Sequence, residues 1–289
     1  MTNDGPMIKL NDGYKMPQLG FGVYRLSDYD HAVKIVEMAL SNGYRLIDTA
    51  EAYHNQRAVG DGIRNSNVRR EDIFLTTKLW ITNFSYDRAT KAIENDLEEL
   101  GTDYIDLMLL HQSVGDIYGA WRALEAAQKA GKIKSIGVSN FFPDRLEDLS
   151  LGNRVKPVID QVEINPWFQR AKMVKYLQNE NVAMEAWSPF ANGKNNIFNN
   201  PLLKQIGEKY NKSVGQVILR WLIQRGIIVI PKSSHNKRQQ ENLAIFDFAL
   251  STTEMKRIAT LDTKQSQFVN HRDPIMIKKI FGPDLVKLR

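Results

Sequence analysis

The chain from residue 73 to residue 111 reads IFLTTKLWITNFSYDRATKAIENDLEELGTDYIDLMLLH. Two short apolar runs, Ile73–Thr77 and Tyr104–Leu110, flank an amphipathic stretch, Tyr86–Leu100, that has helical spacing. Both runs are continuous rather than alternating, as expected of parallel strands that are buried on both faces. Each run leads into a polar residue, Lys78 in the first case and His111 in the second. The stretch therefore predicts a strand–helix–strand unit whose strands end on chemically useful side chains.

The same alternation of apolar run and amphipathic helix continues along the chain. Counted from Phe21, it gives eight strand–helix pairs, the number that closes a (β/α)8 TIM barrel of about 250 residues. An open doubly wound sheet would need a glycine-rich first turn, and Gly20–Arg25 lacks the third glycine of that fingerprint. The predicted strands are Phe21–Tyr24, Tyr44–Asp48, Ile73–Lys78, Tyr104–Leu110, Ile133–Ser139, Val158–Glu163, Ala183–Trp187 and Ile227–Ile230. The predicted helices are His31–Leu40, Arg57–Arg64, Tyr86–Leu100, Ile117–Ala130, Pro143–Leu149, Ala171–Asn179, Val214–Arg225 and Lys237–Phe246.

Segments outside this alternation complete the expected α/β architecture. Met7–Leu19 is predicted to form an N-terminal β-hairpin, because it contains an Asp-Gly pair that favours a tight turn. Asn192–Asn200 is interpreted as a polar surface loop and Ser251–Leu261 as one extra helix. The chain from Asp262 onward is expected to be a short tail. Since no linker, repeat or low-complexity segment interrupts the pattern, residues 1–289 are predicted to form a single domain.

Composition narrows the class of protein further. The chain contains no cysteine, which excludes disulfides, thiolate metal sites and cysteine nucleophiles, and no metal site is predicted. Met1–Pro6 has no apolar signal core, and no window reaches the length of a membrane span, so a cytoplasmic protein is expected. The net charge of +6 can attract a phosphorylated ligand, but no basic stripe with interleaved aromatic residues supports nucleic-acid binding.

Four polar residues at predicted strand ends form the candidate catalytic group. Asp48, Lys78 and His111 follow three different strands, and Tyr53 lies five residues beyond Asp48. In a parallel barrel the catalytic groups come from the C-terminal ends of several strands, so these four side chains should meet at one mouth. A phenol has a pKa of about 10, which a nearby ammonium lowers. We therefore expect Lys78 to tune Tyr53 as a general acid, with Asp48 fixing Lys78 and His111 contacting the substrate oxygen.

The end of the eighth predicted strand carries a second signal. It opens a helix with Lys232, Ser233 and Arg238, and the loops after strands seven and eight of such barrels often bind phosphate. A solvated basic helix start is an equally good interpretation of this segment taken alone. Trp187 can stack on an aromatic ring, and three polar strand-end residues can hydrogen-bond an amide. These three residues are Ser139, Asn140 and Gln161.

Three motifs, in order, resemble the aldo-keto reductase family. They are Gly43–Gln56, which contains Asp48 and Tyr53, then Gly137–Phe141, then Ile230–Ser233 with the residues that follow it. The resemblance runs from about Met7 to Asp262 and implies a (β/α)8 barrel that reduces carbonyl groups with NADPH. It implies a catalytic tetrad of Asp48, Tyr53, Lys78 and His111, and a monomer.

The resemblance also implies the remaining site residues. Ser139, Asn140 and Gln161 would hold the nicotinamide carboxamide, and Trp187 would stack on the ring. Lys232, Ser233 and Arg238 would bind the 2′-phosphate of NADPH or NADP+. Other expected cofactor contacts are Gly22, Val23, Asp48, Ser188, Phe190, Glu241 and Asn242, and the expected substrate contacts are Tyr24, Trp80, His111 and Gln112.

Departures from the family pattern limit the inference about substrate. Gln112 follows the catalytic histidine where many animal members have tryptophan, and the tail after Asp262 is short. The resemblance therefore points to small microbial reductases of aldehydes, α-dicarbonyls or keto-sugars, with a fairly open site. Two other functions remain open: a lyase that uses Lys78 as a Schiff-base amine, and a non-enzymatic module that senses redox state by binding NADPH.

Overall fold

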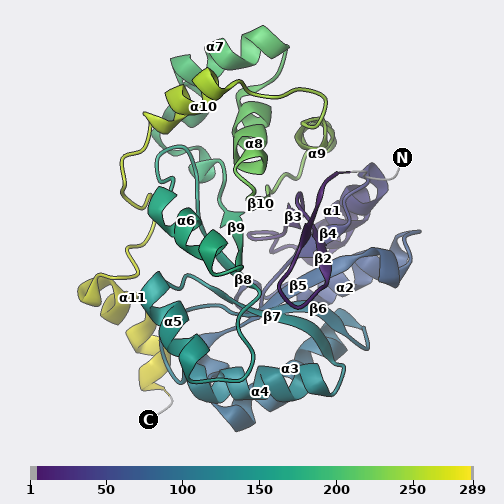
Figure 1. Cartoon of the computed structure of the whole chain (residues 1–289). Helices are drawn as coiled ribbons and strands as arrows, with labels where there is room; N and C mark the ends of the chain where they lie inside the picture. The colour runs from purple at the N-terminus through teal and green to yellow at the C-terminus, as the bar shows by residue number, and fades with distance from the viewer. Residues whose placement is uncertain (1–4, 288–289) are drawn as a thin grey trace.

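Eight parallel strands form the centre of the molecule in a computed structural model that describes residues 5–287 (Figure 1). The strands neighbour one another in chain order, which confirms the predicted barrel strands. They are β3 (Phe21–Gly22), β4 (Leu46–Asp48), β5 (Phe74–Leu79), β6 (Ile105–Leu110), β7 (Ile133–Ser139), β8 (Ile159–Glu163), β9 (Ala183–Trp187) and β10 (Ile228–Val229). Backbone hydrogen bonds from Gly20 to Val229 and from Val229 to Gln18 join the first strand region to the last.

The predicted N-terminal hairpin is also present. It pairs β1 (Met7–Lys9) with β2 (Lys15–Pro17) in antiparallel register, around a turn in which Gly13 takes a φ of 97°. Leu10 and Met16 from this hairpin are buried against the inward-facing apolar side chains of the barrel strands. The hairpin therefore packs against the interior of the barrel and covers one of its ends. Burial of one such side chain stabilises a fold by roughly 1.5–3 kcal/mol.

Helices surround the strands and follow them in the predicted alternation (Figure 1). The helices that follow barrel strands are α1 (Tyr29–Asn42), α2 (Gln56–Asn65), α3 (Tyr86–Leu100), α4 (Ile117–Lys129), α5 (Pro143–Leu151), α6 (Ala171–Asn179), α8 (Val214–Gln224) and α9 (Asn236–Leu243). Short 3-10 turns are η1 (Glu51–Tyr53), η2 (Arg70–Asp72), η3 (Ile81–Asn83) and η4 (Ala191–Asn199). Left-handed glycines end α1 and α3, because a residue without Cβ takes that conformation at low energetic cost.

The extra helix predicted at 251–261 is confirmed as α10 (Thr252–Ala259). Two further helices of the structure were not predicted. The polar loop is a 3-10 segment that leads into α7 (Pro201–Tyr210), which begins with Asn200 as N-cap and Pro201 in the first turn. The second is α11 (Pro274–Val286), which lies within the segment expected to form the C-terminal tail. Asp273 caps this helix by accepting backbone N–H bonds, and Arg272 forms an ion pair with Asp144 of α5, beside which α11 lies in Figure 1.

Among residues 5–287, no helix is long and apolar enough to cross a membrane. The stretch examined for a signal core, Met1–Pro6, lies mostly outside the described residues. That residues 1–289 form one domain stays a prediction.

Candidate active site

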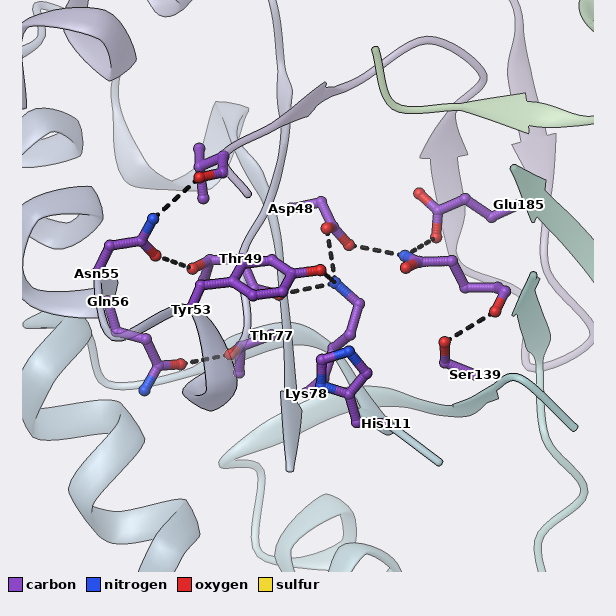
Figure 2. A network of polar contacts seen from close by, with 12 residues as sticks. Asp48, Thr49, Tyr53, Asn55, Gln56, Thr77, Lys78, His111, Ser139 and Glu185 are labelled. Carbon is purple, nitrogen blue, oxygen red and sulfur yellow. Dashed lines mark hydrogen bonds and ion pairs between the residues drawn. The ribbon is translucent and has the colours of Figure 1, made fainter. Parts of the chain in front are cut away.

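The four predicted catalytic side chains meet at one end of the barrel (Figure 2). Asp48 ends β4, Tyr53 lies in η1 directly after it, Lys78 lies in β5, and His111 follows β6. The ring centroids of Tyr53 and His111 are 5.8 Å apart, and the Lys78 ammonium lies 5.0 Å from the Tyr53 ring centre. Strand ends from three strands thus bring an acid, an amine, a phenol and an imidazole together, as the sequence predicted.

Lys78 is fully buried and makes three polar contacts. Its Nζ donates to Asp48 Oδ1 at 2.6 Å and to the Thr49 carbonyl oxygen at 2.9 Å, and it lies 3.4 Å from Tyr53 Oη. Burial lowers the pKa of Lys78, but the Asp48 carboxylate and the Tyr53 oxygen outweigh burial and raise it above its usual value. The lysine is therefore a permanent cation that is held in place by Asp48.

Tyr53 differs from the sequence-based expectation in one respect. Burial raises the pKa of Tyr53 to about 12, and the Lys78 ammonium, which lowers it, compensates only in part. The prediction that Lys78 brings the phenol toward neutral pH is thus wrong for the net shift, because loss of hydration exceeds the attraction of one cation. At neutral pH Tyr53 keeps its proton and can donate it.

His111 is neutral in this environment. Burial, Lys78 and His271 together hold the pKa of His111 well below its usual range. Its Nδ1 atom is buried and has no hydrogen-bond partner among the described residues. The ring lies edge-on to Trp80 with centroids 5.1 Å apart, so a neutral imidazole faces the mouth and can hydrogen-bond an oxygen there.

The residues expected to hold a carboxamide lie beside this group: Ser139 ends β7, Asn140 follows it, and Gln161 lies in β8. Gln161 Nε2 donates to Asp48 Oδ2 at 2.7 Å, and Ser139 Oγ donates to the backbone carbonyl oxygen of Gln161 at 2.8 Å. Asn140 takes a left-handed φ of 61° and accepts a 2.9 Å hydrogen bond from Trp187 Nε1. The three polar residues and the indole are therefore joined into one network that includes the carboxylate of Asp48.

A groove of about 1020 Å³ brings together the residues predicted to bind the distal part of a dinucleotide. Its lining includes Phe190, Lys232, Ser233, Arg238, Glu241 and Asn242. Burial and the Arg25 guanidinium lower the pKa of Lys232. The groove also borders the N-terminus of α8, so it combines cationic side chains with free backbone N–H groups that suit an anion.

Gly22, Val23 and Ser188 lie at or directly after the C-terminal ends of β3 and β9. A Cβ on Gly22 would lie 3.0 Å from the carbonyl oxygen of Ile230, so this position favours glycine. The Val23 amide donates to the Asp48 carbonyl oxygen at 3.1 Å. Ser188 takes a φ of 53° directly after β9, which starts the excursion toward η4.

Aromatic side chains form a wall beside Tyr53 and His111. The ring centroids of Tyr24 and Tyr53 are 5.0 Å apart, and Trp80 lies against His111. That Tyr24 and Trp80 contact the substrate stays a prediction. Gln112 is buried, and its Oε1 has no partner among the described residues.

The expectation of a fairly open site is wrong, because the C-terminal segment folds over the mouth. Trp80 Nε1 donates to Asp284 Oδ2 at 3.0 Å, and Phe281 lies 6.2 Å from Trp80 and also from His271. Phe268 lies 5.4 Å from Trp187. Sequence reasoning missed these residues because no local pattern connects a tail to the strand end it covers.

A carboxylate on β8 anchors this segment. Glu163 accepts hydrogen bonds from Ser266 Oγ at 2.5 Å and from the Gln267 amide at 2.8 Å. Lys194 of η4 in turn donates to the carbonyl oxygen of Gln267 at 2.5 Å. The C-terminal segment and the excursion after β9 are thereby tied to each other above the barrel.

Glu185 is a further buried polar residue that sequence reasoning missed. It lies in β9 and accepts a 2.8 Å hydrogen bond from Gln161, and Figure 2 shows it beyond Asp48 on the side away from Tyr53. The signal was present, since a glutamate in the middle of an apolar strand needs an explanation.

Known proteins resemble the chain over most of its length. The family model described as "Aldo/keto reductase family" matches residues 18–263. "Glyoxal reductase" of Bacillus subtilis is 44% identical over 256 residues, which cover 88% of this chain and 92% of that protein. A crystal structure of an aldo/keto reductase from Brucella melitensis is 45% identical, with a TM-score of 0.86, and the match covers 89% of this chain and 100% of that one. The Bombyx mori aldo-keto reductase in complex with NADP is 34% identical, with a TM-score of 0.87, covering 92% and 95%.

Proposed function

The chain belongs to the aldo/keto reductase family, and we propose on that basis that it reduces small aldehydes, α-dicarbonyls or keto-sugars to alcohols. It is an NADP-dependent oxidoreductase that acts on carbonyl groups. The observation that carries the proposal is the contact of Lys78 with both Asp48 and Tyr53 beside a neutral His111. The proposal goes beyond membership of the family in two respects, which are the substrate class and the role of each residue.

The reaction proposed here needs a hydride and a proton. NADPH supplies the hydride when it is bound. Tyr53 supplies the proton from Oη to the carbonyl oxygen, and the Lys78 cation next to it stabilises the phenolate that remains. Asp48 keeps Lys78 charged and oriented, and His111 donates a hydrogen bond that positions the same oxygen.

The groove beyond Trp187 supports the cofactor assignment. Lys232, Ser233 and Arg238 line it together with Phe190, and this combination of cations, hydroxyl and aromatic ring suits a phosphorylated nucleoside. In the proposal the three polar residues hold the 2′-phosphate, while Glu241 and Asn242 contact the adenine. Among the described residues, no cluster of His, Asp and Glu could hold a metal ion.

The walls of the mouth support small substrates. The rings of Tyr24 and His111 lie against the ring of Tyr53, Trp80 lies against His111, and Phe281 and Asp284 of α11 limit the space above Trp80. Gln112 adds a buried amide whose Oε1 has no partner among the described residues and can accept a hydrogen bond from a substrate hydroxyl, such as that of a keto-sugar. Glyoxal is a compact dicarbonyl of this kind, and the Bacillus subtilis relative is named for its reduction.

A substrate panel with NADPH tests the proposal. Purified protein should consume NADPH when methylglyoxal, glyoxal, a keto-sugar or a short aldehyde is added, and catalytic efficiency should rank the small dicarbonyls first. Binding of NADPH without turnover of any carbonyl would favour the redox-sensing module instead. Gel filtration tests the accompanying proposals that the protein is a monomer and carries no nucleic acid. Cell fractionation tests the proposed cytoplasmic location.

The Schiff-base alternative makes a different prediction. An amine must lose its proton to attack a carbonyl carbon, and Asp48 raises the pKa of Lys78 and so opposes that loss. Treatment with borohydride in the presence of methylglyoxal should therefore leave Lys78 unmodified. A mass increase located on Lys78 would support the lyase.

A further inference from the structure

Three neighbouring strands present a row of polar side chains to the barrel interior. The parallel register pairs Ser139 of β7 with Gln161 of β8, and Gln161 with Glu185 of β9. Register partners on neighbouring strands face the same side of a sheet, and the contact between Gln161 and Asp48 identifies that side. Glu185 is fully buried and is the member of this row that the proposed reaction does not use.

Both amide hydrogens of Gln161 are donated to carboxyl groups. Its Nε2 lies 2.7 Å from Asp48 Oδ2 and 2.8 Å from Glu185 Oε2. A rotation that exchanged nitrogen and oxygen would place the amide oxygen against two carboxyl oxygens. Asp48 occupies one N–H of the Gln161 side chain and Glu185 occupies the other. The side chain of Gln161 therefore has only its amide oxygen, Oε1, left to offer a ligand.

The neighbouring donors are used as well. Ser139 Oγ donates to the backbone carbonyl oxygen of Gln161, and Asn140 Nδ2 donates to the backbone carbonyl oxygen of His111 and to Ser139 Oγ, both at 3.1 Å. Asn140 Oδ1 already accepts from Trp187. The polar groups that remain for a ligand at this subsite are therefore the acceptor oxygens of Gln161 and Ser139.

Glu185 can accept the hydrogen bond from Gln161 in its neutral form, so it needs no nearby cation to balance a charge. The Lys78 charge is paired with Asp48, and burial together with the Asp48 charge raises the pKa of Glu185 to about 8. At neutral pH the carboxyl group is thus largely protonated and accepts from Gln161 through its carbonyl oxygen. Its other oxygen, Oε1, has no partner among the described residues and is free to hold the proton.

We propose that Glu185 is a positioning residue that occupies the second amide hydrogen of Gln161 and so leaves an acceptor-only subsite for the carboxamide of the nicotinamide. Such a subsite accepts N–H groups from a carboxamide and repels a carboxylate at the same place. The inference rests on the proposed function, because it assumes that the dinucleotide binds across this mouth. It assigns to Glu185 the discrimination between the amide and the acid form of the cofactor.

The test compares the binding of NADP+ with that of its deamido analogue, nicotinic acid adenine dinucleotide phosphate, by calorimetry. The wild-type protein should bind NADP+ at least about 10-fold more tightly, because the analogue places acceptor against acceptor. Glu185→Leu removes the acceptor and frees one N–H of Gln161, so the ratio should fall to within about 3-fold of unity. Glu185→Gln keeps an acceptor oxygen and should keep the wild-type ratio.

Asp160→Asn is the matched control. Asp160 precedes Gln161 on β8, is fully buried, and faces the opposite side of the strand, so its substitution should leave the ratio unchanged. Should Glu185→Leu fail to fold, Glu185→Thr, whose hydroxyl is too short to reach Gln161, should lower the ratio in the same way.

Each other outcome has a defined meaning. A wild-type ratio retained in the Leu or Thr variant, a ratio lost in the Gln variant, or equal wild-type affinities for both dinucleotides would overturn the role of Glu185. Absence of NADP+ binding by the wild-type protein would instead contradict the proposed function. The two failures are thereby distinguished.

Discussion

Trp80 donates its indole N–H to the carboxylate of Asp284 across 3.0 Å, although 204 residues separate them in the chain. Trp80 directly follows β5, the strand that carries Lys78, and Asp284 lies in α11. This contact fixes the orientation of an aromatic wall that also touches His111. It joins the C-terminal helix to the reacting group.

Asp284→Ala should loosen that wall. A hydrogen bond to a partly exposed charged acceptor contributes about 1 kcal/mol, so KM for a small dicarbonyl should rise by about 3–5-fold while kcat changes by less than about 2-fold. Steady-state kinetics checks this. Lys287→Ala is the control, because its 3.7 Å ion pair with Asp284 is exposed and should matter little. A large fall in kcat in Asp284→Ala would contradict a role confined to the wall.

Tyr53→Phe should remove the proton donor without removing the cofactor site. Loss of a positioned general acid lowers turnover by about 10²–10⁴-fold, whereas the dissociation constant of NADPH should stay within about 3-fold. Stopped-flow kinetics and fluorescence titration measure the two quantities. Tyr14→Phe, a change of an exposed tyrosine between β1 and β2, is the control. Reduction of the carbonyl substrate by Tyr53→Phe at the wild-type rate would contradict the role of Tyr53 as the proton donor.

Arg238→Ala should separate the two nicotinamide cofactors. Loss of a charge-assisted bond to the 2′-phosphate costs roughly 1.5–3 kcal/mol, so NADPH binding should weaken by about 10–100-fold and NADH binding by much less. Lys237→Ala, an exposed neighbour outside the groove lining, should leave both affinities nearly unchanged. Equal weakening of both cofactors by Arg238→Ala would argue against a 2′-phosphate contact.

The pH profile should show no titration of His111 near pH 6.5. Burial lowers the pKa of His111 well below that value, so the imidazole is already neutral and gains nothing as pH rises through 6.5. Tyr53, with a pKa of about 12, stays protonated throughout. The dependence of kcat/KM on pH checks this. A break near pH 6.5 that disappears in His111→Gln would be the contrary result.

Glu254 should stabilise the fold at neutral pH and lose that effect in acid. Although burial raises its pKa, hydrogen bonds from Lys209, Ser251 and Tyr210 lower the pKa to about 2. A carboxylate with a depressed folded pKa contributes stability above its unfolded pKa of 4.5 and loses it as pH falls toward 2.

Urea unfolding of Glu254→Gln tests this linkage. The variant should lose roughly 1–3 kcal/mol of unfolding free energy at pH 7, and the difference from wild type should shrink toward pH 2. Glu98→Gln, on the exposed face of α3, is the control and should change stability by less than about 0.5 kcal/mol. A difference independent of pH would contradict the ionic origin of the effect.

The barrel could be predicted because its information is local. Continuous apolar runs such as 105–110 mark buried parallel strands, and the polar residues at their ends identify the mouth. The helix at 201–210 was missed because a run of asparagines before it reads as a loop. Its start is set by Asn200 and Pro201, a capping pair that the sequence does contain.

The electrostatics of the site could not be predicted in the same way. A pattern places Lys78 near Tyr53 and so gives the sign of that one interaction. It does not give the depth of burial, which decides the net pKa of Tyr53. The contacts of Asp284 with Trp80 and of Ser266 with Glu163 were equally out of reach, because nothing local announces a partner a hundred or more residues away.

Because Glu163 anchors the C-terminal segment, the residues that shape the rim of the mouth can change in evolution independently of the residues that form the reacting group. Residues 264–287 lie beyond the stretch matched by the family model, yet they supply Phe268, Phe281 and Asp284 to the rim. Mutations there can reshape selectivity while the proton donor and its cation stay untouched. Exchange of this terminus between relatives is accordingly a modular way to diversify what one unchanged reaction centre accepts.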